Sequence, residues 1–169
     1  MAHVSKGYNF VFEGGLNNSY YFETNQNMIY RVRFKPSGYL FEAHKNFANQ
    51  AYEIVIAIVE NRNDANKVPS DVLIKFTIFD IVSDFFKNKE RIVVYICDTA
   101  DLRHRARFRK FSTWFQDIKL SEFVKVDTSI DDPSGLIYLN AIILHRNNPY
   151  FLEIIDAFRK VTGGYAEEK

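Results

Sequence analysis

The stretch that decides the fold class is MIYRVRFK, residues 28–35, because apolar and mostly basic side chains alternate along its whole length. Successive side chains of a β-strand point to opposite faces, so one set faces a core and the other an open surface. The expected core set is Met28, Tyr30, Val32 and Phe34, and the open set is Ile29, Arg31, Arg33 and Lys35. This alternation predicts a half-buried strand of an antiparallel sheet.

Two further strands are expected before this one. YNFVFE (8–13) and YYFET (20–24) are rich in aromatic residues, and the turn sequence GGLNNS separates them. After residue 35, Pro36-Ser37-Gly38 turns the chain into a short strand expected at 39–41. Residues 8–41 are therefore predicted to form a β-meander.

Helical spacing appears next. Phe47, Ala51, Ile54 and Ile58 recur at helical intervals, which predicts a helix over 46–61. Ser70 or Asp71 is expected to cap a second helix that extends to about residue 87, because four later polar residues share one helix face. These polar residues are Asp80, Ser83, Asp84 and Lys87.

The C-terminal half mixes strands and helices. Strands are expected at about 91–97, 123–130 and 136–145, with a basic helix after the first of them. Asn148-Pro149 predicts the start of a last helix, and Gly163-Gly164 its end. Its expected inner face consists of Leu152, Ile155 and Phe158.

The order of these elements predicts an α+β fold: a largely antiparallel sheet with an N-terminal β-meander, covered by about four helices. The length of 169 residues suits a single domain spanning 1–169, with loose termini at 1–7 and 163–169.

Composition narrows the class of protein. The net charge is +1, so no global field favours nucleic acid or a membrane, and any basic site must be local. Cys97 is the single cysteine, which excludes an internal disulfide. The N-terminus lacks a signal-peptide core, and no apolar run reaches the length of a membrane span. We expect a soluble cytoplasmic protein without a membrane partner and without a cofactor.

The positive charge gathers in CDTADLRHRARFRKFSTWF, residues 97–115, which holds five Lys or Arg and two Asp. As a helix, it should bury Phe108, Phe111 and Phe115 on the same sector as His104. Beside that sector lies an expected binding stripe of three cations and an indole, and Arg109 adds a further cation on the far side with Arg105. The stripe consists of Arg103, Arg107, Lys110 and Trp114.

Three functions are compatible with this pattern. The first is a non-enzymatic binding module that holds nucleic acid or a phosphorylated ligand, because guanidinium groups grip phosphate and Trp114 can stack on a base. The second is an enzyme on a phosphorylated substrate, with Asp98 and Asp101 as acid–base or metal groups and Arg103 stabilising charge. The third is a protein-interaction module or homodimer. Against all three stands a purely structural role, in which the acids cap the turn and pair with nearby arginines.

Other candidates are weaker. No glycine-rich phosphate loop, zinc-protease motif or serine-hydrolase motif occurs in the sequence. His104, His145 and Cys97 lie within or beside apolar segments, so we expect them to be core residues rather than catalytic or metal-binding groups.

The stretch YICDTADLRHRARFRKFSTWF, with the later NPYFLEIIDAF, resembles an uncharacterised family of short bacterial (Bacteroidetes-type) proteins that carry a domain of unknown function. The residues that carry the resemblance are Cys97, Asp98, Asp101, Arg103, Arg107, Arg109, Lys110, Phe111, Trp114 and Phe115. The chain departs from the family pattern at Leu102, where a glycine is expected. The resemblance implies a single bacterial cytoplasmic domain and no particular activity.

Overall fold

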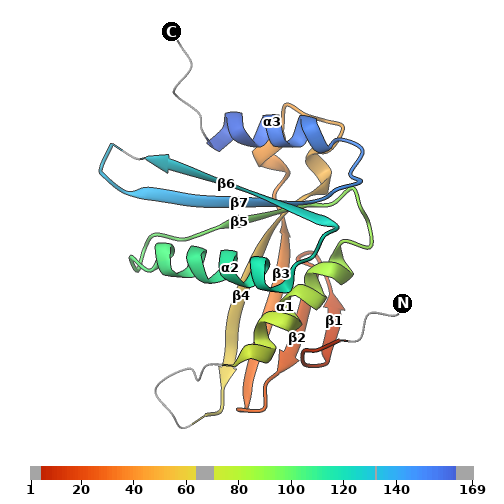
Figure 1. Ribbon diagram of the computed structural model, residues 1–169, viewed down its shortest axis with the longest axis vertical. Coiled ribbons are helices and arrows are strands. Elements are labelled where there is room, and N and C mark those ends of the chain that lie inside the picture. The colour runs from red at the N-terminus through yellow and green to blue at the C-terminus, as the bar shows by residue number, and fades with distance from the viewer. Residues whose placement is uncertain (1–4, 64–70, 132, 163–169) are drawn as a thin grey trace. The chain divides into compact units, whose positions relative to one another are not determined.

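The computed structural model describes residues 5–63, 71–131 and 133–162 (Figure 1). Within them lie seven strands in the order β1-β2-β3-β4-β5-β7-β6 and three α-helices. The strands are β1 Phe10–Gly14, β2 Ser19–Glu23, β3 Met28–Pro36, β4 Ala51–Asn61, β5 Ile92–Ile96, β6 Phe123–Asp131 and β7 Ile137–His145. The helices are α1 Val72–Phe85, α2 His104–Ile118 and α3 Phe151–Thr162. The predicted α+β class with a mostly antiparallel sheet is confirmed, but the described residues hold three α-helices rather than about four.

The chain divides into two compact units. The first consists of residues up to 35 and 54–87, and the second of residues 36–53 and those from 88 onward. A single domain over 1–169 stays a prediction. The expected loose C-terminus at 163–169, together with the Gly163-Gly164 helix end, lies outside the described residues.

The first unit contains the predicted meander. β1 pairs with β2, and β2 with β3, in antiparallel register, with Tyr21 opposite both Val11 and Arg31. Burial along β3 alternates as the sequence predicts, and Phe34 of the buried set contacts α1. The Phe34 and Phe85 rings stack with centroids 3.8 Å apart.

The expected strand at 39–41 is wrong, because these residues form a short 3₁₀ turn, Gly38–Phe41.

Helix α1 begins where the sequence predicts. The Asp71 carboxylate accepts a hydrogen bond from the Leu73 N–H at 2.9 Å, which satisfies one of the unpaired donors of the first turn. The segment before β1 lies against the helix, since the Tyr8 N–H donates to Thr77 Oγ1 at 2.7 Å. A Cβ at Gly7 would lie 2.5 Å from the Thr77 backbone nitrogen, so only glycine fits there.

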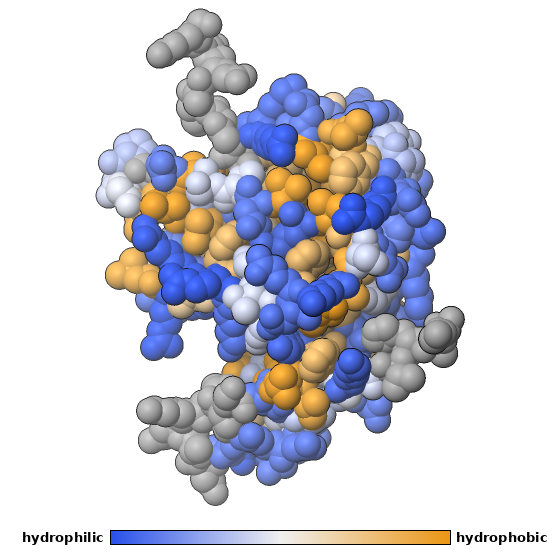
Figure 2. Space-filling model, viewed as in Figure 1, coloured by the Kyte–Doolittle hydropathy of each residue, from blue (hydrophilic) through white to orange (hydrophobic). Residues whose placement is uncertain are grey.

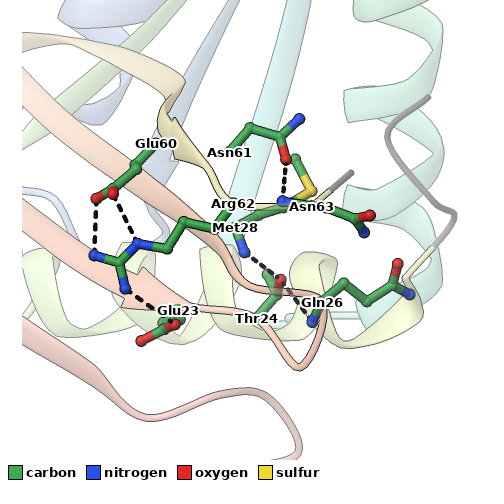
Figure 3. Close-up of polar contacts among 8 residues, drawn as sticks. All are labelled: Glu23, Thr24, Gln26, Met28, Glu60, Asn61, Arg62 and Asn63. Carbon is green, nitrogen blue, oxygen red and sulfur yellow. Dashed lines mark hydrogen bonds and ion pairs between the residues drawn. The ribbon is translucent and has the colours of Figure 1, made fainter. Parts of the chain in front are cut away.

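The outer end of β4 is tied to the β2–β3 turn by Arg62 (Figure 3). Its guanidinium pairs with Glu60 at 2.7 Å and reaches Glu23 at 4.0 Å. Its backbone N–H donates to the Asn27 carbonyl at 3.0 Å. One residue therefore joins β4 to the meander through both backbone and side chain.

The predicted helix over 46–61 is wrong, because residues 51–61 form strand β4. The stretch IVIAIV, residues 54–59, contains five β-branched residues in six, and such side chains favour the pleated surface of a strand over a helix. β4 pairs with β5 in parallel, with Ala51 opposite Ile92. Phe47, Ala51 and Ile54 are all buried, so their spacing imitates the buried face of a helix, although Ala51 and Ile54 lie on a strand.

The second unit places helices on both faces of its strands. One face packs against α3 and the 3₁₀ turns through a buried apolar cluster. This cluster consists of Phe41, Phe47, Ala51, Ile92, Val94, Ile142, Leu144, Ile154, Ala157 and Phe158. The opposite face carries Tyr95 and Lys125, which contact α2. In Figure 1, α2 and α3 accordingly lie on either side of the β5, β6 and β7 ribbons.

The expected inner face of α3 is only partly correct. Phe158 is buried and Ile155 packs against the cluster, but Leu152 is 79% exposed. Ile154 and Ala157 complete the buried face instead. The Asn148 side chain accepts a hydrogen bond from the Tyr150 N–H at 2.9 Å, as a capping residue does, but α3 begins at Phe151 rather than at the predicted Pro149.

Candidate functional site: the basic helix α2 and the turn before it

Helix α2 is anchored by aromatic packing on one sector. Phe111 is buried, and its ring lies 4.2 Å from that of Tyr95 on β5. Phe108 and Phe115 are half-buried, and His104 is buried on the same sector. The helical phase predicted from the sequence is therefore confirmed, and it fixes which cations face solvent.

The turn from β5 into α2 uses both acidic residues. Asp98 accepts a hydrogen bond from the Ala100 N–H at 2.9 Å, and Asp101 accepts one from the Arg103 N–H at 3.1 Å. The bond from the Arg103 backbone lowers the pKa of Asp101, and the charge of Arg107 lowers it further. Each carboxylate thus closes its own turn, as the structural alternative predicts, although Arg103 rather than Asp101 occupies the capping position of α2.

Leu102 adopts a left-handed backbone at the centre of this turn, with φ at +59°. This is the position at which the sequence resemblance implied a glycine. A side chain costs roughly 1–2 kcal/mol in this conformation, and Leu102 is 73% exposed, so little packing compensates. The backbone of the turn is therefore the one a glycine would favour.

Replacing Leu102 with glycine is expected to raise the free energy of unfolding by up to about 1 kcal/mol, because strain disappears and little contact is lost. Chemical denaturation measures this change. Leu16→Gly is the matched control, since Leu16 is 90% exposed and is not among the described residues with positive φ. That control should lose stability, and a loss of the same size at Leu102 would contradict the strain.

The cations of α2 fall into two groups. Arg107 donates to the Asp98 carbonyl at 3.2 Å and pairs with the Asp101 carboxylate. Lys110 lies 5.0 Å above the Trp114 ring. The predicted stripe of Arg103, Arg107, Lys110 and Trp114 is thus largely engaged in local contacts.

Three guanidinium groups of this region are exposed and make no ion pair with any residue that the structure describes: Arg103, Arg105 and Arg109. Arg105 and Arg109 are four residues apart, so their side chains are neighbours on the helix surface. Figure 2 shows hydrophilic side chains along α2. Of the stripe predicted from the sequence, Arg103 alone joins this unpaired set; Arg109 was predicted separately, and Arg105 had no assigned binding role.

Sequence reasoning missed Lys125 on β6. Its side chain is 7% exposed, and its ammonium group donates to Ser112 Oγ at 2.9 Å and pairs with Asp127. It also lies 5.0 Å above the Phe108 ring. The signal was present in Lys125-Val126-Asp127, since residues two apart share one face of a strand. This buried charge is compensated and joins α2 to the sheet.

No group of three metal-ligating side chains occurs in the described ranges 5–63, 71–131 and 133–162. His145 accepts a hydrogen bond from the Asn147 N–H at 3.0 Å, and burial lowers its pKa. Burial also raises the pKa of the Cys97 thiol. Both residues are buried, in agreement with their expected core roles. The enzymatic alternative at Asp98, Asp101 and Arg103 stays a prediction.

Comparison with known proteins identifies one family. Its model, described as a family of unknown function (DUF6169), matches residues 70–160, which is more than half of the chain. The chain belongs to this family. No curated protein and no solved structure matches the chain.

The matched residues of the DUF6169 family begin just before α1 and include the whole of α2 with its acidic turn. The sequence resemblance to a domain of unknown function is thereby confirmed, while a bacterial origin and a cytoplasmic location stay predictions. None of the helices that the structure describes is both long and apolar enough to cross a bilayer.

Proposed function

We propose that this member of the DUF6169 family is a non-enzymatic binding module that holds the phosphate backbone of a single-stranded nucleic acid on α2. The observation that supports the proposal is a set of three exposed guanidinium groups that make no ion pair with a described residue: Arg103, Arg105 and Arg109. They lie within seven consecutive residues of a chain whose net charge is only +1. The positive field is local, as a site for an anion requires.

The chemistry of arginine favours phosphate over other partners. A guanidinium group presents a planar fork of donors that matches two phosphate oxygens, and its charge persists at every physiological pH. Neutralising phosphates releases counterions, so several arginines act together through a single favourable term. A helix that packs on a sheet through Phe111 holds their backbone positions in place.

The contacts of Arg107 and Lys110 support a division of labour. Because Arg107 bonds to the turn before α2, it holds the start of the helix rather than a ligand. The Lys110 ammonium group lies over the Trp114 ring. A base could therefore stack only on the part of the indole that Lys110 does not cover. The proposed binding therefore depends mainly on phosphate contacts by Arg103, Arg105 and Arg109.

The test is fluorescence anisotropy with labelled single-stranded RNA and DNA across a salt series. The triple variant Arg103→Ala, Arg105→Ala, Arg109→Ala is expected to reduce the slope of log K against log salt by about 2. At low salt its affinity should fall at least tenfold, because three phosphate contacts are lost.

A charge-matched control removes Lys45, Lys89 and Arg159, three exposed cations outside α2 that make no ion pair with a described residue. It should keep most of the affinity and the original salt slope. Equal losses in the two triple variants, or no binding to either nucleic acid at low salt, would remove the proposal.

A further inference from the structure

The sheet face of the first unit that points away from α1 carries two arginines that make no ion pair with any described residue. The residues of β3 that contact α1 are the even-numbered ones, as the stack of Phe34 on Phe85 shows. Arg31 and Arg33 alternate with them and so lie on the opposite face. In Figure 1, α1 lies on one side of the β2 and β3 ribbons, and within the described residues of this unit no second helix covers the other side.

One nitrogen of each guanidinium group, the Nε atom of Arg31 and of Arg33, is buried and has no hydrogen-bond partner among the described residues. Neither arginine makes an ion pair with a described carboxylate. A buried donor without an acceptor destabilises the folded protein, so an acceptor supplied by a ligand would offset that penalty.

The neighbours of the pair do not neutralise it. Tyr21 lies directly opposite Arg31, and Val11 lies opposite Tyr21, so an aromatic and an apolar side chain flank that arginine. Glu23, which pairs with Ile29 on the same face, reaches Arg62 at the end of β4 (Figure 3). On the β2 side, Arg31 therefore has aromatic and apolar neighbours and no acidic partner among the described residues.

The spacing of the pair suits one tetrahedral oxyanion. Residues two apart on a strand are separated by about 6.6 Å, and the long side chains can converge on one group between them. Two planar forks then offer donors to several oxygens of a single phosphoryl group. We propose that Arg31 and Arg33 form a phosphate-binding site on this sheet face, independent of the nucleic-acid site on α2.

Arginine side-chain NMR tests the site directly, because buried Nε–H groups exchange slowly with water. Titration with inorganic phosphate should shift the Nε–H signals of Arg31 and Arg33 in a saturable manner. Arg31→Lys and Arg33→Lys should each weaken binding at least tenfold, since lysine keeps the charge but loses the fork. Arg159→Lys, which changes an exposed arginine of α3, should leave phosphate binding unchanged.

Two further arms separate the source of the phosphoryl group and the two sites. A nucleoside monophosphate that binds more tightly than inorganic phosphate would assign the site to phosphate esters, and the reverse order to free phosphate. The double variant Arg105→Ala, Arg109→Ala should leave these shifts intact even if nucleic-acid binding is lost. Absent shifts at Arg31 and Arg33 in the folded protein, or shifts that Arg31→Lys does not weaken, would overturn the inference.

Discussion

Phe111→Ala is expected to lower the free energy of unfolding by about 3–5 kcal/mol, because it leaves a cavity beneath α2. The ring is 2% exposed and stacks on Tyr95 with centroids 4.2 Å apart. Among the rings of Phe108, Phe111 and Phe115, it alone is fully buried. Chemical denaturation followed by circular dichroism measures the change.

Thr113→Ala is the control for this variant, since Thr113 is exposed on the same helix. It should change stability by no more than about 0.5 kcal/mol. A loss below about 1 kcal/mol in Phe111→Ala would contradict the placement of this ring in the core.

The second large effect is expected at Phe34 in the first unit. Phe34 is fully buried and stacks on Phe85 of α1, with the two rings nearly parallel at 3°. Phe34→Ala should therefore also lower the free energy of unfolding by about 3–5 kcal/mol. The same denaturation experiment, repeated with near-ultraviolet circular dichroism, follows the loss of aromatic packing.

Phe12→Ala provides the matched comparison in this unit, because Phe12 is 54% exposed on β1. Its loss should be clearly smaller, since less apolar area leaves water on folding. Equal losses at Phe12 and Phe34 would mean that the meander does not pack on α1 through its even-numbered face.

The meander could be predicted because its signal is local and periodic. Buried and more exposed residues alternate along MIYRVRFK, and Phe34 of the buried set stacks on α1, so one-dimensional alternation carried the three-dimensional information. The start of α1 was equally local, because Asp71 caps the helix through a residue two positions away. The aromatic sector of α2 followed from helical spacing alone.

β4 and α3 could not be assigned correctly in the same way. β4 is apolar on both faces near Ala51 and Ile54, so no alternation distinguishes it from a buried helix, and β-branched content was the only local signal. In α3 several apolar residues compete for one face, and packing against the second unit's cluster selected Ile154 and Ala157 over Leu152. Tertiary contacts decided both cases.

The local charge of the sequence indicated the candidate site, but which of its cations are available to a ligand depends on contacts that the sequence does not reveal. Arg107 bonds to the Asp98 carbonyl and Lys110 lies over the Trp114 ring. These two predicted binding cations are therefore engaged within the protein. Arg105 joins the available cations because nothing described pairs with it. The neighbours of Arg31 were likewise undetermined until strand register placed Tyr21 beside it.

The measurement that tests the central claim most directly is a backbone-amide NMR titration of the protein with a single-stranded oligonucleotide. The account predicts saturable, salt-sensitive shifts concentrated in residues 103–110, at the start of α2, with smaller changes at Trp114. Saturable shifts that leave residues 103–110 unaffected, or no shifts at low salt, would contradict the assignment of α2 as the binding surface.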